Sequence, residues 1–255
     1  MPLIKTEGII LQQRPFSETS KILVAYTGNK GKVSLLFKGG RKGVKKFPGG
    51  LETLNRVELQ YYHKDSRNLQ NFKSFDLIDT FSDMRADFSR MYTALSIGET
   101  ILRTTADEEE NADLYNYLIQ TFEALNLYPN NPWTLRWKSL LDVSRSLGFG
   151  FSLGGCIGCD KKGTIKSFDL SAGGFLCDKH KIDPSHVVPS SGEVWGVLRF
   201  LGQCPFEAAP RMVVNAITGR KIEALFLRYF RYHVPTIRSF ESWKILDEVY
   251  WGKGK

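Results

Sequence analysis

The sequence predicts a two-part α+β fold, with a small five-stranded β-barrel in residues 1–80 and an α-helical domain in residues 81–255 that carries a zinc-finger-like module at 150–185. Three observations lead to this prediction. Short alternating apolar and polar runs, separated by turn residues, fill the first part of the chain. In the second part, apolar residues recur every three to four positions, as on one face of a helix. Two pairs of metal-ligand residues then stand at the spacing of a zinc site.

The composition is that of an ordinary globular protein. The chain has 255 residues, of which 42% are hydrophobic and 24% charged, enough for two small domains with a real core. It has no long apolar run and no apolar signal core at its start, so we expect no membrane segment and a cytoplasmic location. Cysteines arranged for a metal in such a chain favour a reducing compartment over a disulfide framework.

The net charge of +8 is unevenly distributed. Residues 1–80 hold 14 Lys and Arg against 7 Asp and Glu, residues 81–150 hold 6 against 10, and residues 151–255 hold 15 against 10. A positive field on one part of a protein favours polyanions such as nucleic acid. Because many soluble proteins are mildly basic, the charge alone leaves this function open.

Five short strands are expected in the first part. They cover residues 3–13, 21–27, 32–38, 54–63 and 68–78. The stretch Gly28-Asn29-Lys30-Gly31 predicts a tight turn, because Gly and Asn tolerate positive φ. Five strands with turns between them fit the OB-fold, a barrel whose face binds single-stranded nucleic acid. Tyr61, Tyr62, Phe72 and Phe75 are candidates for base stacking, although core packing is the commoner role for each.

A basic, glycine-rich segment follows the third strand. Residues 38–50 contain five basic side chains and five glycines. Glycine leaves the backbone open to close approach, and the cations attract phosphate. The Gly-Lys-Ser/Thr ending of a mononucleotide-binding loop is missing. The segment is either a solvated surface loop or a flexible arm that follows a nucleic-acid backbone.

The residues expected to bind DNA phosphates are basic side chains of the barrel, of this segment and of a late helix. They are Arg14, Lys30, Lys32, Lys38, Arg41, Lys42, Lys45, Lys46, Arg228 and Arg231. The contribution of the two arginines on the late helix is an alternative to a purely solvated basic face. Sequence preference should be slight, because phosphate contacts carry no base identity.

Helical periodicity predicts the elements of the second part. Helices are expected at 82–105, 133–147, 213–234 and 240–250, with two more starting after residue 110 and at residue 191. The stripe of Met and aromatic residues on the first of them is most simply core. The acidic run Asp107-Glu108-Glu109-Glu110 is expected to open a helix, whose positive N-terminus would stabilise it.

The metal site is predicted by Cys156-x-x-Cys159, a spacer of 17 residues, and Cys177-x-x-His180. Two residues between paired ligands let both side chains bind one ion, and two such knuckles complete a tetrahedron around zinc. Four protein ligands leave no open position, so the zinc would be structural. His186 is an alternative fourth ligand. Cys204 is interpreted as a small buried hydrophobic residue.

Several short motifs, in their order and spacing, resemble the RecO family of bacterial recombination mediators across nearly the whole chain. These are Glu7-Gly8-Ile9-Ile10-Leu11, Phe16-Ser17-Glu18, Thr27 followed by Gly31, Lys38-Gly39-Gly40-Arg41, the Cys/His knuckles, and Leu227-Arg228-Tyr229-Phe230-Arg231-Tyr232-His233. Members of the family with the metal commonly have four cysteines, whereas here His180 stands in the last place.

The resemblance implies an N-terminal OB-fold joined to a helical domain interrupted by a zinc module, and a non-enzymatic role in DNA repair, recombination and the DNA damage response. It implies binding of single- and double-stranded DNA, annealing of complementary strands, and a nucleoid-associated location. RecR, possibly RecF, single-strand-binding protein and indirectly RecA are the implied partners, in the RecFOR pathway. Two alternatives stay open: a zinc-stapled protein–protein adaptor and a nucleic-acid-processing enzyme.

Overall fold

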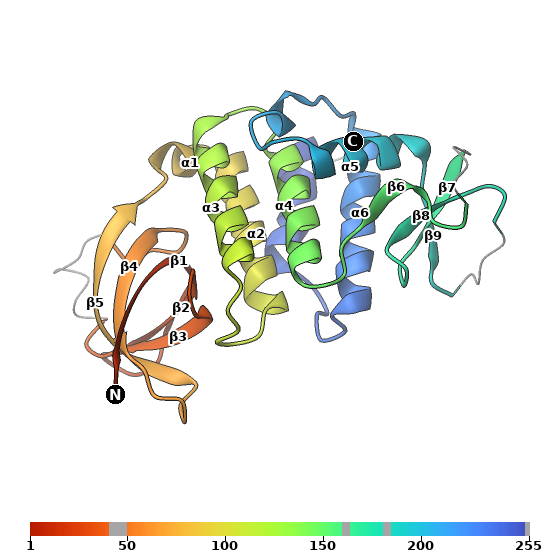
Figure 1. Ribbon diagram of the computed structural model, residues 1–255. Coiled ribbons are helices and arrows are strands. Elements are labelled where there is room, and N and C mark those ends of the chain that lie inside the picture. Colours follow the sequence, from red (N-terminus) through yellow and green to blue (C-terminus); the bar gives the residue numbers. More distant parts are fainter. Residues whose placement is uncertain (41–49, 160–163, 181–184, 253–255) are drawn as a thin grey trace. The chain divides into compact units, whose positions relative to one another are not determined.

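The computed structural model describes residues 1–40, 50–159, 164–180 and 185–252 (Figure 1). The chain forms two compact units, Met1–Asn126 and Leu127–Lys255. The first unit therefore includes helices as well as the barrel, and the division into a barrel domain at 1–80 and a helical domain at 81–255 stays a prediction. Among the described residues, no helix combines the length and the apolar character needed to cross a bilayer.

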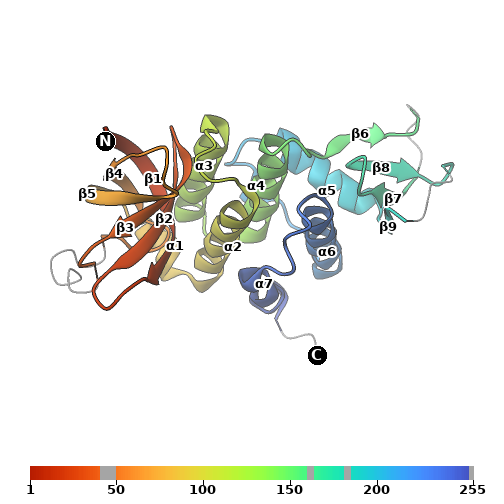
Figure 2. The same ribbon diagram turned by 90° about the horizontal axis from the view of Figure 1, so that it is seen from below.

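The first unit begins with a closed barrel of five strands (Figures 1 and 2). The strands are β1 (Leu3–Pro15), β2 (Lys21–Thr27), β3 (Gly31–Phe37), β4 (Arg56–Tyr62) and β5 (Leu69–Asp79). Their order around the barrel is β1-β2-β3-β5-β4, and β1 pairs antiparallel with both β2 and β4 to close it. β3 and β5 pair in parallel. This confirms the predicted five-stranded OB-like barrel.

The inside of the barrel is filled by alternate residues of its strands, as period-two side-chain alternation requires. The buried core consists of Ile10, Leu23, Ala25, Val33, Leu35, Val57, Leu59 and Tyr61. Phe72 and Phe75 pack against this core and are partly buried. Of the four stacking candidates, Tyr61 is thus a core residue, and Tyr62 on the outer face is 40% exposed.

Helices of the same unit cover the outer face of β1 and β2. They are α1 (Ser82–Ala86), α2 (Phe88–Thr104) and α3 (Ala112–Leu127). Outward-facing Ile22, Val24 and Tyr26 of β2 are buried. A Cβ built on Gly98 of α2 would lie 3.6 Å from Leu11, so this helix packs directly on β1. The stripe of Met and aromatic residues expected to be core is so only in part: Phe81 and Met84 are buried, whereas Phe88 at the start of α2 is 59% exposed.

Two helix predictions in this unit are wrong in detail. The helix predicted at 82–105 is broken at Asp87, whose extended backbone (φ −107°, ψ 120°) ends α1 and whose carboxylate caps α2 by accepting from the N–H of Arg90. The acidic run 107–110 does not open α3, which starts at Ala112. It lies in the connection between α2 and α3 and contacts the barrel.

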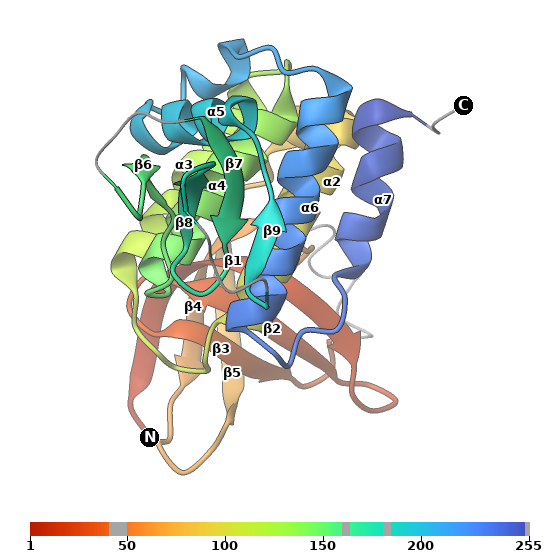
Figure 3. The ribbon, with the colours of Figure 1, turned by 90° about the vertical axis from the view of Figure 1, so that its right-hand side faces the viewer.

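In its described residues, the second unit combines four α-helices and a short 3₁₀ helix, η2 (Ala209–Arg211), with a small sheet (Figures 1 and 3). The helices are α4 (Pro132–Ser146), α5 (Gly192–Gln203), α6 (Ala216–His233) and α7 (Glu241–Trp251). The strands β6 (Ser152–Cys156), β7 (Ile165–Asp169), β8 (Gly174–Cys177) and β9 (Val187–Pro189) form a sheet in the order β6-β8-β7-β9. Sequence periodicity predicted the helices but none of these strands, and it placed the start of α6 three residues early, before its cap Asn215.

Candidate metal centre and nucleic-acid interface

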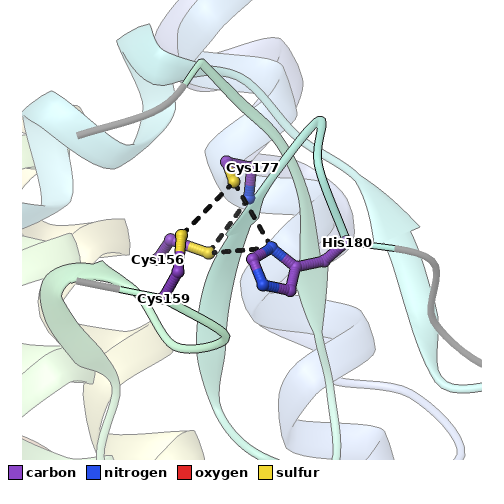
Figure 4. A group of neighbouring side chains, drawn as sticks. All are labelled: Cys156, Cys159, Cys177 and His180. Atoms are coloured by element: carbon purple, nitrogen blue, oxygen red, sulfur yellow. Dashed lines mark hydrogen bonds between the residues drawn. The ribbon is translucent and has the colours of Figure 1, made fainter. Parts of the chain in front are cut away.

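The four predicted metal ligands come together at one end of the small sheet (Figure 4). Cys156 ends β6 and Cys177 ends β8, and Cys159 and His180 follow in the turns after these strands. The N–H of Cys177 donates to Sγ of Cys156 over 3.3 Å, which ties the two knuckles together. The four ligand atoms all lie within 4.8 Å of one another. The structure therefore places the predicted set, with His180 as its fourth member, around one point.

The distances within this group match a zinc tetrahedron. With Zn–S bonds of about 2.3 Å and a Zn–N bond of about 2.0 Å, two sulfurs would be separated by about 3.8 Å, and a sulfur and a nitrogen by about 3.5 Å. The Sγ atoms of Cys159 and Cys177 are 3.8 Å apart. The Nδ1 atom of His180 is 3.6 Å from Sγ of Cys156 and 3.4 Å from Sγ of Cys177. The residues present can hold a zinc ion, and an ion held by all four would be structural.

Backbone N–H groups near Cys156 favour the thiolate form of this ligand. Partial desolvation raises the pKa of the Cys156 thiol, but the N–H groups of Cys177, Gly158 and Cys159 outweigh it and lower this pKa to about 7. A thiolate is the form that binds metal, so this cysteine is ready to do so near neutral pH.

Gly158 supplies the space that the histidine occupies. A Cβ built on Gly158 would lie 2.5 Å from Cδ2 of the His180 ring, a separation that Cβ atoms essentially never show. Residue 158, directly before Cys159, must therefore lack a side chain for the imidazole to lie where it does.

His186 and Cys204 both lie outside the group of four ligands. The ring of His186 lies against Tyr232 of α6, with the ring centroids 5.3 Å apart. Cys204 caps the C-terminal end of α5 and is half-buried, and burial raises the pKa of its thiol. Its position agrees with a small packing residue.

Strand register places the described DNA candidates at two different ends of the barrel. Arg14 pairs with Ile22 near the end of β1, and Lys21 pairs with Phe37 at the end of β3, directly before Lys38. Arg14 and Lys38 therefore share one end, and both are exposed. Lys30 lies in the β2–β3 turn at the opposite end. We refer to the first as the Arg14/Lys38 end.

Sequence reasoning missed two further cations at the Arg14/Lys38 end. Lys21 begins β2, and its Nζ donates to Oε1 of Gln13 over 3.2 Å. Lys73 is exposed on β5, two positions after Asn71, which pairs with Leu36 of β3. Because β3 and β5 run in parallel, Lys73 lies level with Lys38, two residues beyond the Leu36–Asn71 pair. The sequence spacing does not reveal that these two strands pair, so Lys73 could not be placed at this end from the sequence.

Lys32 is not an open phosphate contact. Its Nζ donates to the carbonyl oxygens of Leu102 and Thr105, at 3.0 and 2.5 Å, and lies 3.3 Å from Oδ1 of Asp107. Only 13% of its side chain is exposed. The cation is thus engaged at the C-terminal end of α2, where the helix dipole favours positive charge.

The remaining candidates lie in different settings. Arg41, Lys42, Lys45 and Lys46 fall outside the described residues, and the chain enters that segment from Lys38. Arg228 and Arg231 are both exposed on α6 of the second unit, and Nη2 of Arg231 donates to the carbonyl oxygen of Arg238 over 2.6 Å.

A pocket of about 270 Å³ lies between α6 and α7, which run side by side (Figure 3). Its wall is apolar and includes Leu227, Phe240 and Trp243. The last two rings are stacked, with centroids 4.4 Å apart. Three cations, on Arg220, Arg231 and Lys244, also line it, together with the carboxylate of Glu223.

The fold and the site define a class of protein: an OB-like barrel followed by a helical body with a Cys₃His knuckle pair. Comparison with protein families gives the same assignment in more detail. The model described as "Recombination protein O N terminal" matches residues 1–81, and the model described as "Recombination protein O C terminal" matches residues 85–239. The chain belongs to the RecO family.

Curated relatives span nearly the whole chain. A protein of Thermoanaerobacter sp. (strain X514) is 22% identical over 92% of this chain and 94% of its own length. One from Exiguobacterium sibiricum is 26% identical over 96% of both chains. One from Prosthecochloris aestuarii is 33% identical over 61% of this chain and 59% of its own. All three are named DNA repair protein RecO.

Proposed function

We propose that this chain is a non-enzymatic DNA repair and recombination mediator that binds single- and double-stranded DNA and anneals complementary strands. It would act in the cytoplasm at the nucleoid, with RecR and possibly RecF, and help to load RecA onto strands coated with single-strand-binding protein. Membership of the RecO family supports the repair role. Structural zinc in the Cys156/Cys159/Cys177/His180 group would stabilise the second unit.

The observation that carries the DNA-binding part is the grouping of cations at the Arg14/Lys38 end. Arg14, Lys21, Lys38 and Lys73 gather there from four strands or their ends, and the basic segment with Arg41, Lys42, Lys45 and Lys46 continues directly from Lys38. The β1–β2 loop at this end carries a single carboxylate, Glu18. Neutralising two complementary backbones at once lowers their mutual repulsion, so base pairing can nucleate.

The pocket between α6 and α7 combines an apolar wall with three cations, a chemistry that would accept an acidic peptide carrying an apolar side chain. An apolar wall would accept an apolar side chain, and Arg220, Arg231 and Lys244 would attract neighbouring carboxylates. We therefore propose it as the site for the acidic tail of single-strand-binding protein. A Lys244→Glu variant should bind that protein more weakly while binding bare DNA as before; unchanged binding to the protein would exclude the pocket.

The adaptor and enzyme alternatives predict different observations. Among the described residues, the group of His, Cys, Asp and Glu side chains placed to hold a metal is the Cys₃His set, whose four ligands would leave no position for substrate. An adaptor would bind partner proteins but little DNA at physiological salt. An enzyme would cut or modify labelled nucleic acid in the presence of Mg²⁺ or Mn²⁺.

The DNA-binding proposal is tested by removing charge at the Arg14/Lys38 end. Arg14→Gln with Lys38→Gln, and separately Arg41, Lys42, Lys45 and Lys46 changed to Glu, should weaken binding to single-stranded DNA. Each lost phosphate contact should also reduce the salt slope, d log K/d log[salt], by about 0.7. Lys166→Gln with Arg211→Gln removes the same charge as the first variant from exposed positions in the second unit. If every variant bound DNA with the affinity and salt slope of the unaltered chain, the Arg14/Lys38 end would not be part of the DNA interface.

A further inference from the structure

The acidic run Asp107–Glu110 is fixed against the end of the barrel that lies opposite the Arg14/Lys38 end. The N–H of Glu108 donates to the carbonyl oxygen of Lys32 over 2.8 Å, and Asp107 forms the ion pair with the Lys32 side chain. On the other side, Nε2 of Gln70 donates to Oε1 of Glu108 over 2.9 Å. The segment thus contacts β3 and β5 within one unit. We call it the acidic clamp.

Three residues of the barrel are shaped for this contact. Gly31 has a φ of +55°, and a Cβ there would collide with the carbonyl oxygen of Glu109, so the β2–β3 turn has no side chain where the clamp crosses it. Gln70 is completely buried. His63, 9% exposed, lies with Nδ1 3.8 Å from Oε1 of Glu108. A loop held through backbone, amide and ion-pair contacts keeps its charges in a defined place.

The clamp reverses the charge of this end of the barrel. Its two outer carboxylates, on Glu109 and Glu110, are exposed. The cations nearby are Lys30 and Lys32 at the turn and Lys64 and Arg67 on the β4–β5 loop, against the four clamp carboxylates and Asp65. The balance is four positive and five negative charges, and Lys32 is already paired with Asp107. At the Arg14/Lys38 end, the four cations are accompanied by the exposed carboxylates of Glu18 and Glu52, with Asp76 and Asp79 further along β5.

We propose that the acidic clamp excludes nucleic acid from this end of the barrel, so that a strand is held at the Arg14/Lys38 end alone. Phosphates approaching Lys30 come within a Debye length, about 10 Å at 0.1 M salt, of the exposed carboxylates and are repelled. This inference rests on the proposed DNA binding and adds that the interface is one-ended. Lys30, which the sequence suggests as a phosphate contact, would then make none in the intact protein.

The test is the variant Glu109→Gln with Glu110→Gln. Neither residue takes part in an ion pair within the described part of the chain, and both substitutions keep side-chain size, so the barrel contacts of Asp107 and Glu108 are preserved. We expect this variant to bind a dT oligonucleotide about two- to fivefold more tightly at low salt, with the gain fading by about 1 M salt because screening removes the repulsion. Asp83→Asn with Glu248→Gln is the matched control, because it removes the same charge from exposed positions elsewhere.

Lysine footprinting gives the position of the strand directly. With DNA bound to the unaltered chain, Lys38 and Lys73 should be protected from acetylation and Lys30 should not. In the clamp variant, Lys30 should gain protection.

These experiments distinguish failure of the one-ended interface from failure of the proposed DNA binding. If the unaltered chain binds DNA and the clamp variant behaves as the control does, or if Lys30 is protected in the unaltered chain, the one-ended interface is wrong and the DNA-binding proposal stands. If the unaltered chain binds no DNA at all, the proposed function fails and this inference fails with it.

Discussion

Gly158 lies between the cysteines of the first knuckle and makes room for the ring of His180. Gly154, in β6 of the same module, has open space around it, because a Cβ there would meet no atom within 4 Å. Alanine substitutions at Gly154 and Gly158 therefore distinguish the general effect of replacing a glycine from the effect of filling the space that the His180 ring needs.

Gly158→Ala should lower zinc affinity by about tenfold or more, because the histidine must move away from the position where its nitrogen meets the three sulfurs. Gly154→Ala should retain zinc as the unaltered chain does. Competition with a metal chelator measures both. Equal retention by the two variants would show that the Gly158 space is irrelevant to the site.

His233 links α6 to the small sheet of the same unit. Its Nε2 donates to the carbonyl oxygen of Leu170 over 2.9 Å, and its ring stacks on Phe149 with a centroid distance of 4.7 Å and an interplanar angle of 5°. Burial lowers the pKa of His233 below its ordinary value of 6.5, and the hydrogen bond to Leu170 only partly opposes this.

The lowered pKa makes a pH prediction. Because the unfolded chain takes up the proton first, the stabilising contribution of neutral His233 is complete above pH 6.5 and is lost as the pH falls through the folded-state pKa. Urea unfolding at pH 7.5 and 5.5 should therefore show a larger loss of stability in the unaltered chain than in His233→Gln, which has no titrating group there. The same pH dependence in both chains would contradict this.

Lys32 shows where residue-level reasoning from sequence stops. Alternation along β3 correctly directs its side chain outward, and outward lysines next to a basic segment suggest phosphate binding. The carbonyl oxygens that occupy it belong to Leu102 and Thr105, some 70 residues later in the chain. No local pattern reveals that partner. The four metal ligands, in contrast, were predictable because paired spacing is itself the geometric requirement.

At the scale of elements, Lys32 caps α2 from outside the helix. A cation at the helix C-terminus that also satisfies two carbonyl groups stabilises both the helix end and its contact with the barrel.

Lys32→Met should therefore reduce the free energy of unfolding by about 1–2 kcal/mol and leave DNA affinity nearly unchanged. Lys30→Met, in the neighbouring turn, should cost little stability. Chemical denaturation and a DNA-binding titration check the two effects separately. If Lys32→Met instead weakened DNA binding without changing stability, Lys32 would be a DNA contact.

A buried arginine joins three helices of the second unit. Arg136 of α4 is fully buried; it pairs with Glu223 of α6, and its guanidinium lies 4.0 Å from the ring centroid of Trp243 on α7. Glu223 also accepts from Nε1 of Trp137 over 2.6 Å. The pocket between α6 and α7 depends on this arrangement, because Glu223 and Trp243 both line it.

Arg136→Met should destabilise the chain by about 3–5 kcal/mol, since it leaves the Glu223 carboxylate without its cation. Adding Glu223→Gln removes that charge while keeping an acceptor for Trp137, so the double variant should recover part of the loss. Denaturation of the two variants and the parent measures this. A double variant less stable than Arg136→Met alone would show that the uncompensated charge is not the cause.

The elements that sequence predicted well are those with a regular period. All five barrel strands alternate, and α2 to α7 place apolar residues on one face, so both types were found. The break at Asp87 escaped because Met84, Phe88 and Met91 continue the helical period across it. Strands β6 to β9 escaped because they have only 3–5 residues, one of them Ser152-Leu153-Gly154-Gly155-Cys156, without alternation.

At the scale of the whole molecule, the two proposed roles fall on different compact units. The barrel unit carries the Arg14/Lys38 end and the acidic clamp, and the second unit carries the metal group and the pocket between α6 and α7. On the proposed function, the chain would hold a DNA strand on the first unit and a protein partner on the second.

The measurement that tests the central claim most directly is strand annealing. Two complementary DNA strands, each coated with single-strand-binding protein, are mixed with and without the zinc-loaded chain, and duplex formation is followed over a salt series. We predict faster annealing that fades as salt is added, and a loss of this acceleration in the chain with Arg14→Gln and Lys38→Gln. No acceleration by folded, zinc-loaded protein at any salt concentration would contradict the account.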